Sequence, residues 1–313
     1  MKKIILCTTF RDFKGTENDN IQRLFLNSIA SQTYKNFELV VTLFGEKNVQ
    51  NEVEKYDFPS CFYSAEVNDC RYTLTSVVNN AIGYAIGAGE DYILLWSTCD
   101  VVYDINFFQE IVELPEINLL GTSHPHVIYK NVEDYVTTQN SLTGKLFCGF
   151  DLIFFDSSFL DNEVRNILQN YKFYDWGVFE HFLIALAEVK QKNNSKVNFI
   201  NIYETSKISK IENDRQLTNE PSVFLIKSHE RNTIELKRFL SDYKLSYLYF
   251  DLTYCHLKSR VNNKSLNHYW VFKRDIIEYL SRLSMFYLRF YIEKFYIAKI
   301  TKDYLKKMIR GRV

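Results

Sequence analysis

The sequence predicts an α/β fold in which a doubly wound, mostly parallel sheet carries helices on both faces. Three observations predict it. The 313 residues include only 10 Gly and 4 Pro, too few for the many turns of an all-β fold. Short, β-branched apolar runs alternate with longer stretches of helical periodicity. The run DYILLW at residues 91–96 is apolar on both faces, which is typical of a central parallel strand.

The first third of the chain predicts four strands alternating with helices. Strands are predicted from short apolar runs, and helices from apolar residues three or four positions apart. Gly89 follows the second predicted helix, where a left-handed cap is favoured. Because strand–helix–strand connections are right-handed, this order leads to a doubly wound sheet. The predicted strands are 3–10, 37–44, 61–65 and 91–96, and the predicted helices are 20–31 and 71–88.

The pattern beyond Asp104 is mixed. We expect one domain over residues 1–245 and a helical, basic and aromatic region over 246–313. Residues 190–196 (KQKNNSK) are predicted to form an exposed loop. The other predicted strands are 117–120, 147–155, 197–202 and 223–226, and the other predicted helices are 159–168, 178–190, 230–243 and 276–309.

Charge is balanced overall but unevenly distributed. Both the basic and the acidic residues number 38, so no global field attracts nucleic acid. Nine basic and two acidic residues give Arg282–Val313 a net charge of +7, and the rest of the chain therefore carries −7. Basic residues interleave with aromatic ones over 276–310, a pattern that favours an anionic membrane surface. Packing of this helix on the main domain, or dimerisation, is the alternative.

The six cysteines and the lengths of the apolar runs indicate the cellular compartment of the protein. No cysteine pair has a metal-ligand spacing, and a chain of this length does not depend on disulfides. No signal peptide and no apolar run of about 18 residues is present. We therefore expect a reduced, cytoplasmic protein, with peripheral attachment to the inner face of the cytoplasmic membrane as a possibility.

Polar residues follow three predicted strands, at the sheet edge where open α/β sheets bind ligands. They are Thr8-Thr9-Phe10-Arg11, Glu46 and Ser97-Thr98-Cys99-Asp100. The motifs GxxxxGK[ST], GxSxG and HExxH are absent, and the glycines that precede residue 91 do not form a dinucleotide fingerprint. These absences argue against a P-loop NTPase, a Rossmann dehydrogenase, a serine hydrolase and a zinc peptidase.

Residues 28–41 (SIASQTYKNFELVV) resemble the S-I-x-x-Q-T-Y-x-N-F-E stretch of family 2 GT-A glycosyltransferases. Thr8–Arg11 falls where that family has Pro-Thr-Tyr-Asn, and 79–83 (NNAIG) followed by 91–95 (DYILL) resembles its run into the metal-binding turn. The similarity is collinear over residues 3–110 and weaker to residue 240. It implies a GT-A-like fold and inverting transfer of a sugar from a nucleotide-sugar to a hydroxyl of a glycan or lipid-linked glycan, in bacterial polysaccharide or lipopolysaccharide assembly.

In that family an Asp-x-Asp turn holds Mg²⁺ or Mn²⁺ against the donor diphosphate, because a hard cation takes oxygen ligands. The matching residues here are Ser97-Thr98-Cys99-Asp100, in which only Asp100 keeps a carboxylate and the soft Cys99 is poorly suited to Mg²⁺. The resemblance implies Asp100 and His229 as metal ligands, with His229 at the start of a predicted helix. The alternative is that Ser228 caps that helix and His229 is merely exposed.

The resemblance also implies the donor and acceptor sides. Tyr174–His181 (YDWGVFEH) is similar to the acceptor-side W-G-x-E-D element, with Glu180 as general base and Asp175 as the second choice. Trp176 offers a flat face to a sugar ring and His181 lies beside it in sequence, although Trp176 as a core residue is the alternative. Phe10 either stacks on the base or belongs to the core. The donor-binding residues implied are Thr8, Thr9, Phe10, Arg11, Glu46, Arg71, Ser97 and Asp100.

Two other functions are weighed. A non-catalytic binder of sugar nucleotides or glycans on the same fold would explain the incomplete Asp-x-Asp motif. A nucleotidyltransferase is disfavoured because no Gly-rich loop with a lysine follows the first strand.

Overall fold

The computed structural model describes most of the first 245 residues. All of them belong to one compact unit, Met1–Thr253. The predicted region 246–313, with its helix at 276–309, lies outside the described residues, so the domain boundary stays a prediction. The described ranges are 2–66, 73–88, 91–114, 118–123, 127–129, 132–137, 152–174, 179–193, 197–201, 208–211 and 223–245.

A seven-stranded mixed sheet forms the centre of this unit. Its strand order is β3-β2-β1-β4-β8-β6-β9. The first four strands are mutually parallel, β8 is antiparallel to both of its neighbours, and β9 is parallel to β6. The strands are β1 (Lys3–Thr8), β2 (Phe37–Leu43), β3 (Ser60–Ser64), β4 (Tyr92–Ser97), β6 (Leu119–Ser123), β8 (Leu152–Asp156) and β9 (Asn198–Asn201).

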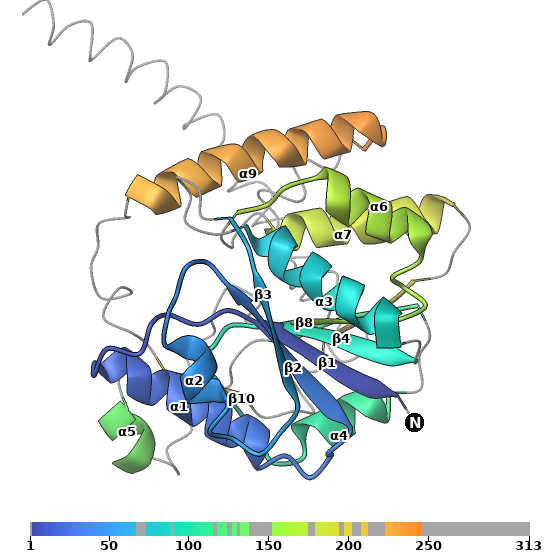
Figure 1. Cartoon of the computed structure of the whole chain (residues 1–313). Helices are drawn as coiled ribbons and strands as arrows, with labels where there is room; N and C mark the ends of the chain where they lie inside the picture. Colours follow the sequence, from blue (N-terminus) through green and yellow to red (C-terminus); the bar gives the residue numbers. More distant parts are fainter. Residues whose placement is uncertain are drawn as a thin grey trace, which may run out of the picture. The chain divides into compact units, whose positions relative to one another are not determined.

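Helices cover both faces of the sheet, as the sequence predicts (Figure 1). On one face, Ile4 and Leu6 of β1 pack in a cluster with Phe25 and Ile29 of α1. On the other face, α3 contacts β1, β2 and β4. Both faces of the central strands β1, β2 and β4 are therefore covered, which explains why these strands are largely apolar. The first face carries α1 (Glu17–Ala30), α2 (Val49–Val53) and α4 (Phe107–Val112), and the second carries α3 (Leu74–Ala88), α6 (Asn162–Asn170) and α7 (Phe179–Lys192), with α9 (Val223–Asp242) packed against α7.

Helix α1 begins three residues earlier than predicted, because a carboxylate caps its start. Asp19 accepts hydrogen bonds from the backbone N–H groups of Gly15 (2.5 Å) and Thr16 (3.3 Å), and from the Thr16 hydroxyl (3.2 Å). These bonds hold the chain that enters the first turn, where backbone N–H groups have no partner within the helix. The helix therefore starts at Glu17.

A small second sheet was not predicted. It has the order β5-β10-β7, with β5 at Val101–Tyr103, β10 at Ile208–Ile211 and β7 at Val127–Tyr129. Strand β10 is antiparallel to β5, and Lys210 lies opposite Val101. The short helix α5 (Val132–Thr137) contacts β7. Because β5 starts directly after Asp100, this sheet brings a distant segment to the turn that follows β4.

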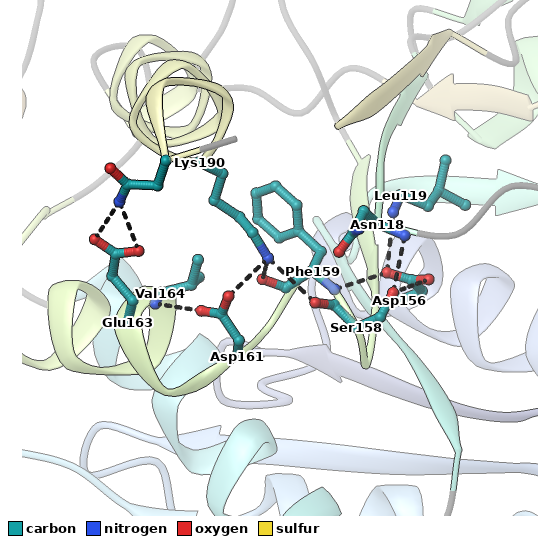
Figure 2. A network of polar contacts seen from close by, with 10 residues as sticks. Asn118, Leu119, Asp156, Ser158, Phe159, Asp161, Glu163, Val164 and Lys190 are labelled. Atoms are coloured by element: carbon teal, nitrogen blue, oxygen red, sulfur yellow. Dashed lines mark hydrogen bonds and ion pairs between the residues drawn. The ribbon is translucent and has the colours of Figure 1, made fainter. Parts of the chain in front are cut away.

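The predicted loop at residues 190–196 is wrong over residues 190–192, which belong to α7. Lys190 belongs to α7 and is 2% exposed. Its ammonium group lies 3.0 Å from the Asp161 carboxylate and donates to the carbonyl oxygens of Ser158 (3.1 Å) and Phe159 (2.8 Å), as Figure 2 shows. Asp161 also caps α6 by accepting from the Val164 N–H. Lysine is rarely buried unless it is paired, and here it joins the end of α7 to the start of α6.

The C-terminal half contains one further correction. Residues 223–226, predicted as a strand, form the first turn of α9. Ser228 is consequently inside the helix and buried, so it is not an N-cap. Within the described residues, no helix is both long enough and apolar enough to span a bilayer.

Candidate functional site

The candidate site lies at the carboxyl ends of β1 and β4. These strands are parallel neighbours. The chain runs from β1 outward through β2 to β3, and then returns to the other side of β1 as β4. The strand order therefore reverses between β1 and β4, which is where open α/β sheets bind ligands.

A buried hydrogen bond joins the two strand ends. The Thr8 hydroxyl donates to the carbonyl oxygen of Ser97 at 2.7 Å, and both residues are buried. The Ser97 hydroxyl in turn donates to the carbonyl oxygen of Thr98 at 3.0 Å. Two of the predicted donor-binding hydroxyls, those of Thr8 and Ser97, are thus engaged with the backbone, and the Thr8 bond fixes the turn after β4 relative to β1.

Gln22 of α1 holds the loop after β1 in place. Its Oε1 accepts from the N–H of Arg11 at 2.7 Å, and its Nε2 donates to the carbonyl oxygen of Arg11 at 3.1 Å. The Cys99 thiol donates to the same Oε1 at 3.8 Å. A single buried amide therefore holds the Arg11 backbone beside the turn that carries Asp100.

Asp100 forms an ion pair with Lys210 of β10. The Lys210 Nζ lies 3.5 Å from the Asp100 Oδ2, and the two side chains are 3% and 14% exposed, respectively. The Ile211 N–H also donates to the Asp100 carbonyl oxygen at 3.0 Å. The other carboxylate oxygen, Oδ1, is buried without a hydrogen-bond partner in the part of the chain that the structure describes. Sequence reasoning missed Lys210, since nothing local in KISKI indicates a strand that pairs with residues 101–103.

The thiol of Cys99 is held neutral. The pKa of Cys99 is raised to about 12, chiefly by burial and also by the negative charge of Asp100, while the positive charges of Arg11 and Lys210 partly oppose the increase. The thiolate is the form of cysteine that binds metals. Before any metal binds, Cys99 is therefore a neutral thiol at neutral pH.

The turn after β4 carries the described part of the predicted metal site. Ser97 is bonded to the backbone, Cys99 is protonated, and an ammonium group lies beside Asp100. Among the described residues, no group of three or more His, Cys, Asp and Glu side chains could hold a metal ion. His229 lies within α9, not at its start, and its side chain is outside the described residues. The described part of the predicted set does not fit Mg²⁺ or Mn²⁺.

The other predicted donor-binding residues differ in their burial and contacts. Phe10 is 2% exposed and packs edge-on against Phe25, with ring centroids 5.7 Å apart, so the core alternative describes it. Glu46 accepts from the Phe44 N–H at 2.5 Å and closes the turn at Gly45, whose φ is 96°. Thr9 is half-buried beside Thr8. Arg71 lies outside the described residues.

The acceptor side is described only in part. Helix α7 begins at Phe179, so Glu180 and His181 lie in its first turn. Phe179 packs edge-on against Trp96, the next-to-last residue of β4, with ring centroids 6.4 Å apart. This contact brings the start of α7 to the strand end that leads to Asp100. The side chains of Glu180 and His181 are outside the described residues, as are Asp175 and Trp176 entirely.

Asn232 of α9 fixes the chain just before Asp175. Its Oδ1 accepts from the Tyr174 N–H at 2.7 Å, and its Nδ2 donates to the Tyr174 carbonyl oxygen. The Arg231 guanidinium lies 5.5 Å from the centroid of the Tyr174 ring. Sequence reasoning missed Asn232, which is fully buried. Nothing in the sequence around Asn232 indicates that its side chain bonds to the backbone of Tyr174, 58 positions earlier.

No protein-family model matches the sequence, and no curated protein matches it. Solved structures with a partly similar fold include both glycosyl and nucleotidyl transferases. Mannosyltransferase PcManGT from Pyrobaculum calidifontis, in complex with GDP-Man and Mn²⁺, has a TM-score of 0.44 at 12% identity and aligns over 80% of this chain and 69% of that chain. Inositol-1-phosphate CTP transferase from T. maritima has a TM-score of 0.42 at 12% identity and aligns over 75% of this chain and 96% of that chain. S. aureus TarS has a TM-score of 0.43 at 14% identity and aligns over 80% of this chain and 44% of that chain. Likenesses at this level do not decide the family.

Proposed function

We propose that this protein is a GT-A-like glycosyltransferase that moves a sugar from a nucleotide-sugar donor to a hydroxyl of a glycan acceptor. The observation that carries the proposal is the convergence at the strand-order reversal. There the Thr8–Ser97 bond joins β1 to β4. The turn that carries Asp100 lies beside the Arg11 backbone, and Lys210 pairs with the Asp100 carboxylate. The resemblance of residues 28–41 to family 2 enzymes supports the same assignment.

The donor half of the proposed site uses the ends of β1 and β4. A guanidinium group binds phosphate oxygens in a planar, two-pronged geometry. Arg11 is the candidate for this contact, since Gln22 fixes its backbone beside the Asp100 turn. Thr9, Glu46 and Arg71 are kept as donor-side candidates, whereas the ring of Phe10 supports the core beneath them.

The acceptor half uses the start of α7. We assign Glu180 as the general base, with Asp175 as the second choice and with Trp176 and His181 on the acceptor side. The acceptor oxygen bonds to the anomeric carbon as the bond from that carbon to the diphosphate breaks. The hydroxyl proton passes to the Glu180 carboxylate, the nucleoside diphosphate leaves, and the configuration inverts. The Trp96–Phe179 contact supports this arrangement, because it brings the first turn of α7 to the end of β4.

The setting follows from the acceptor class. Bacterial polysaccharide or lipopolysaccharide assembly uses glycan and lipid-linked glycan acceptors, and we propose such an acceptor here. Attachment of residues 276–310 to an anionic membrane surface stays a prediction, since these residues are outside the described part of the chain.

A second candidate, a non-catalytic binder of sugar nucleotides, is favoured by one observation. Asp100, the last remaining carboxylate of the Asp-x-Asp position, is engaged by Lys210. A binder would hold the donor but would not turn it over.

Calorimetry with UDP-, GDP- and CMP-sugars, followed by measurement of donor hydrolysis and transfer, tests the proposal. Glu180→Gln is expected to keep donor affinity and to lose turnover by about 10²-fold or more. Glu188→Gln, two turns further along the same helix, is the control and should keep both. Unchanged turnover in Glu180→Gln removes this residue as base. Binding without turnover by the unmodified protein favours the binder, and binding of no donor refutes the proposal.

A further inference from the structure

We infer that Lys210 neutralises Asp100 in the place where a GT-A transferase uses a divalent cation, so that the site binds a nucleoside diphosphate without Mg²⁺ or Mn²⁺. The inference rests on the proposed function for the nature of the ligand. The ion pair between Lys210 and Asp100, with its 3.5 Å distance, is independent of it.

Strand pairing fixes the lysine at this position. Lys210 is the third residue of β10 and lies opposite Val101, the residue that follows Asp100. The Ile211 N–H donates to the Asp100 carbonyl oxygen at 3.0 Å, which locks the two segments in register. Strand β10 is the central strand of the small sheet and pairs with β5 on one side and β7 on the other. The backbone of Lys210 is therefore held on both sides, and its side chain is 3% exposed.

A divalent cation would have to share the same carboxylate. With the ammonium group 3.5 Å from Oδ2, such a cation would lie within a few ångströms of a fixed positive charge and would be repelled. The other side chains of this turn bring no further negative charge to offset the repulsion, since Ser97 and Thr98 carry neutral hydroxyl groups and Cys99 carries a thiol. The buried Oδ1 of Asp100 alone is a single ligand, whereas Mg²⁺ takes six in near-octahedral geometry.

Neutralisation of Asp100 has a consequence for an anionic ligand. An unpaired carboxylate at this turn would repel a diphosphate, and a metal ion would normally cancel that charge. Lys210 cancels it instead, from inside the protein, and leaves Arg11 to contact the phosphates. Lys210 is thus a positioning residue that acts through Asp100.

The metal part is tested by electron paramagnetic resonance of Mn²⁺ titrated into the full chain. The unmodified protein is expected to bind no Mn²⁺ at Asp100, so its spectra and those of Asp100→Asn should match. Mn²⁺ that the unmodified protein binds and Asp100→Asn loses would overturn the inference, whatever the function of the protein.

The ligand part is tested by calorimetry with UDP and GDP, in excess EDTA and in excess MnCl₂. We expect affinities that agree within about twofold between the two conditions. Lys210→Met should weaken binding about tenfold in EDTA, and Mn²⁺ should recover part of the loss. Lys55→Met, which removes an exposed ion pair with Glu52, is the matched control. A requirement for Mn²⁺ in the unmodified protein would overturn the inference.

Asp100→Asn keeps the inference testable if Lys210→Met does not fold. A metal-dependent site would lose nucleotide affinity in this variant, whereas we expect affinity that is unchanged or higher. If neither nucleotide binds under any condition, the proposed function fails, and the Mn²⁺ spectra still decide whether Asp100 holds a cation.

Discussion

The hydroxyl of Thr8 and the carbonyl oxygen of Ser97 lie 2.7 Å apart and join the ends of two parallel strands at the point where the strand order reverses. The bond is buried, so water does not compete with it. It sets the position of the turn that carries Asp100. The site therefore depends on a hydroxyl that points into the protein rather than toward a ligand.

Thr8→Val should lower the free energy of unfolding by about 1–2 kcal/mol, because valine keeps the shape but removes the donor. Urea denaturation measures this. Thr33→Val is the control: its hydroxyl donates to the Ile105 carbonyl oxygen at 3.3 Å in an exposed position, and its loss should cost less than about 0.5 kcal/mol. Equal effects of the two substitutions would show that the Thr8 bond has no special weight.

Gly121 of β6 is expected to tolerate no side chain. A Cβ atom placed there would lie 1.9 Å from the Phe154 ring, which is fully buried in β8. Gly121→Ala should therefore cost about 2 kcal/mol or more in urea denaturation, since the ring must move within a packed core. Gly83→Ala, with nothing within 4 Å in the interior of α3, should instead stabilise by about 0.5–1 kcal/mol. A loss at Gly83 and none at Gly121 would contradict both expectations.

Stability is expected to fall at alkaline pH, in part through Cys61. Burial raises the pKa of Cys61 from 9.0 to about 11, and the nearby negative charge of Glu38 adds to the increase. The folded state keeps its proton where the unfolded chain releases it. The contribution is therefore complete below pH 9.0 and is lost as the pH rises through about 11.

Urea denaturation at pH 8 and pH 10.5, with Cys61→Ala beside the unmodified protein, checks this. The unmodified protein should lose more stability between the two values than the variant, by roughly 1 kcal/mol after allowance for the partly exposed position of the thiol. Identical losses would mean that the thiol titrates normally.

The four strands at 3–8, 37–43, 60–64 and 92–97 were predictable because their signals are local. Apolar residues on both faces indicate a buried parallel strand wherever it occurs, and the structure confirms each within three residues. The small sheet was not predictable, because residues 208–211 (ISKI) form a strand by pairing with residues 101–103 and 127–129, both far away in the sequence. The sequence predicts a strand at residues 223–226 because an apolar, partly β-branched turn at a helix start has the same composition as a short strand.

The candidate site was predictable on the same terms. Thr8 and Ser97 end two neighbouring strands, and Arg11 and Asp100 lie in the segments that follow, so the sheet brings them to one edge as the sequence predicts. What each side chain does there was not predictable. Lys210 and Asn232 act through contacts with distant segments, and a sequence gives no register for such contacts.

Lys190 is expected to be essential for stability. In Lys190→Met the stem is kept, but the carbonyl oxygens of Ser158 and Phe159 lose their donor inside the protein (Figure 2). Asp161 is 43% exposed, so its charge can still be hydrated. We expect a loss of about 2–4 kcal/mol in urea denaturation. Lys192→Met, an exposed position on the same helix, should change stability by less than about 0.5 kcal/mol. A loss below about 1 kcal/mol at Lys190 would contradict the expectation.

Asn232 is expected to affect turnover beyond its effect on stability. Both of its amide atoms bond to the Tyr174 backbone, and the neighbouring Phe173 carbonyl oxygen accepts from the Leu74 N–H at 2.7 Å. The chain is thus fixed immediately before Asp175 and Trp176, the proposed acceptor side. Asn232→Leu leaves a buried N–H and a buried carbonyl group without partners, which should cost about 2–3 kcal/mol.

Kinetics separate positioning from folding. Asn232→Leu should lower kcat about tenfold or more with a smaller change in donor affinity, because Tyr174 directly precedes the proposed acceptor-side residues Asp175 and Trp176. Asn232→Asp keeps the acceptor oxygen and loses the donor, so its effect should be intermediate. Asn79→Leu is the control: it removes a side-chain bond of α3 to the Leu168 carbonyl oxygen, and it should cost stability while kcat is kept. If Asn79→Leu and Asn232→Leu lower kcat equally, Asn232 contributes only to folding, because the loss then follows stability and not the position of Tyr174.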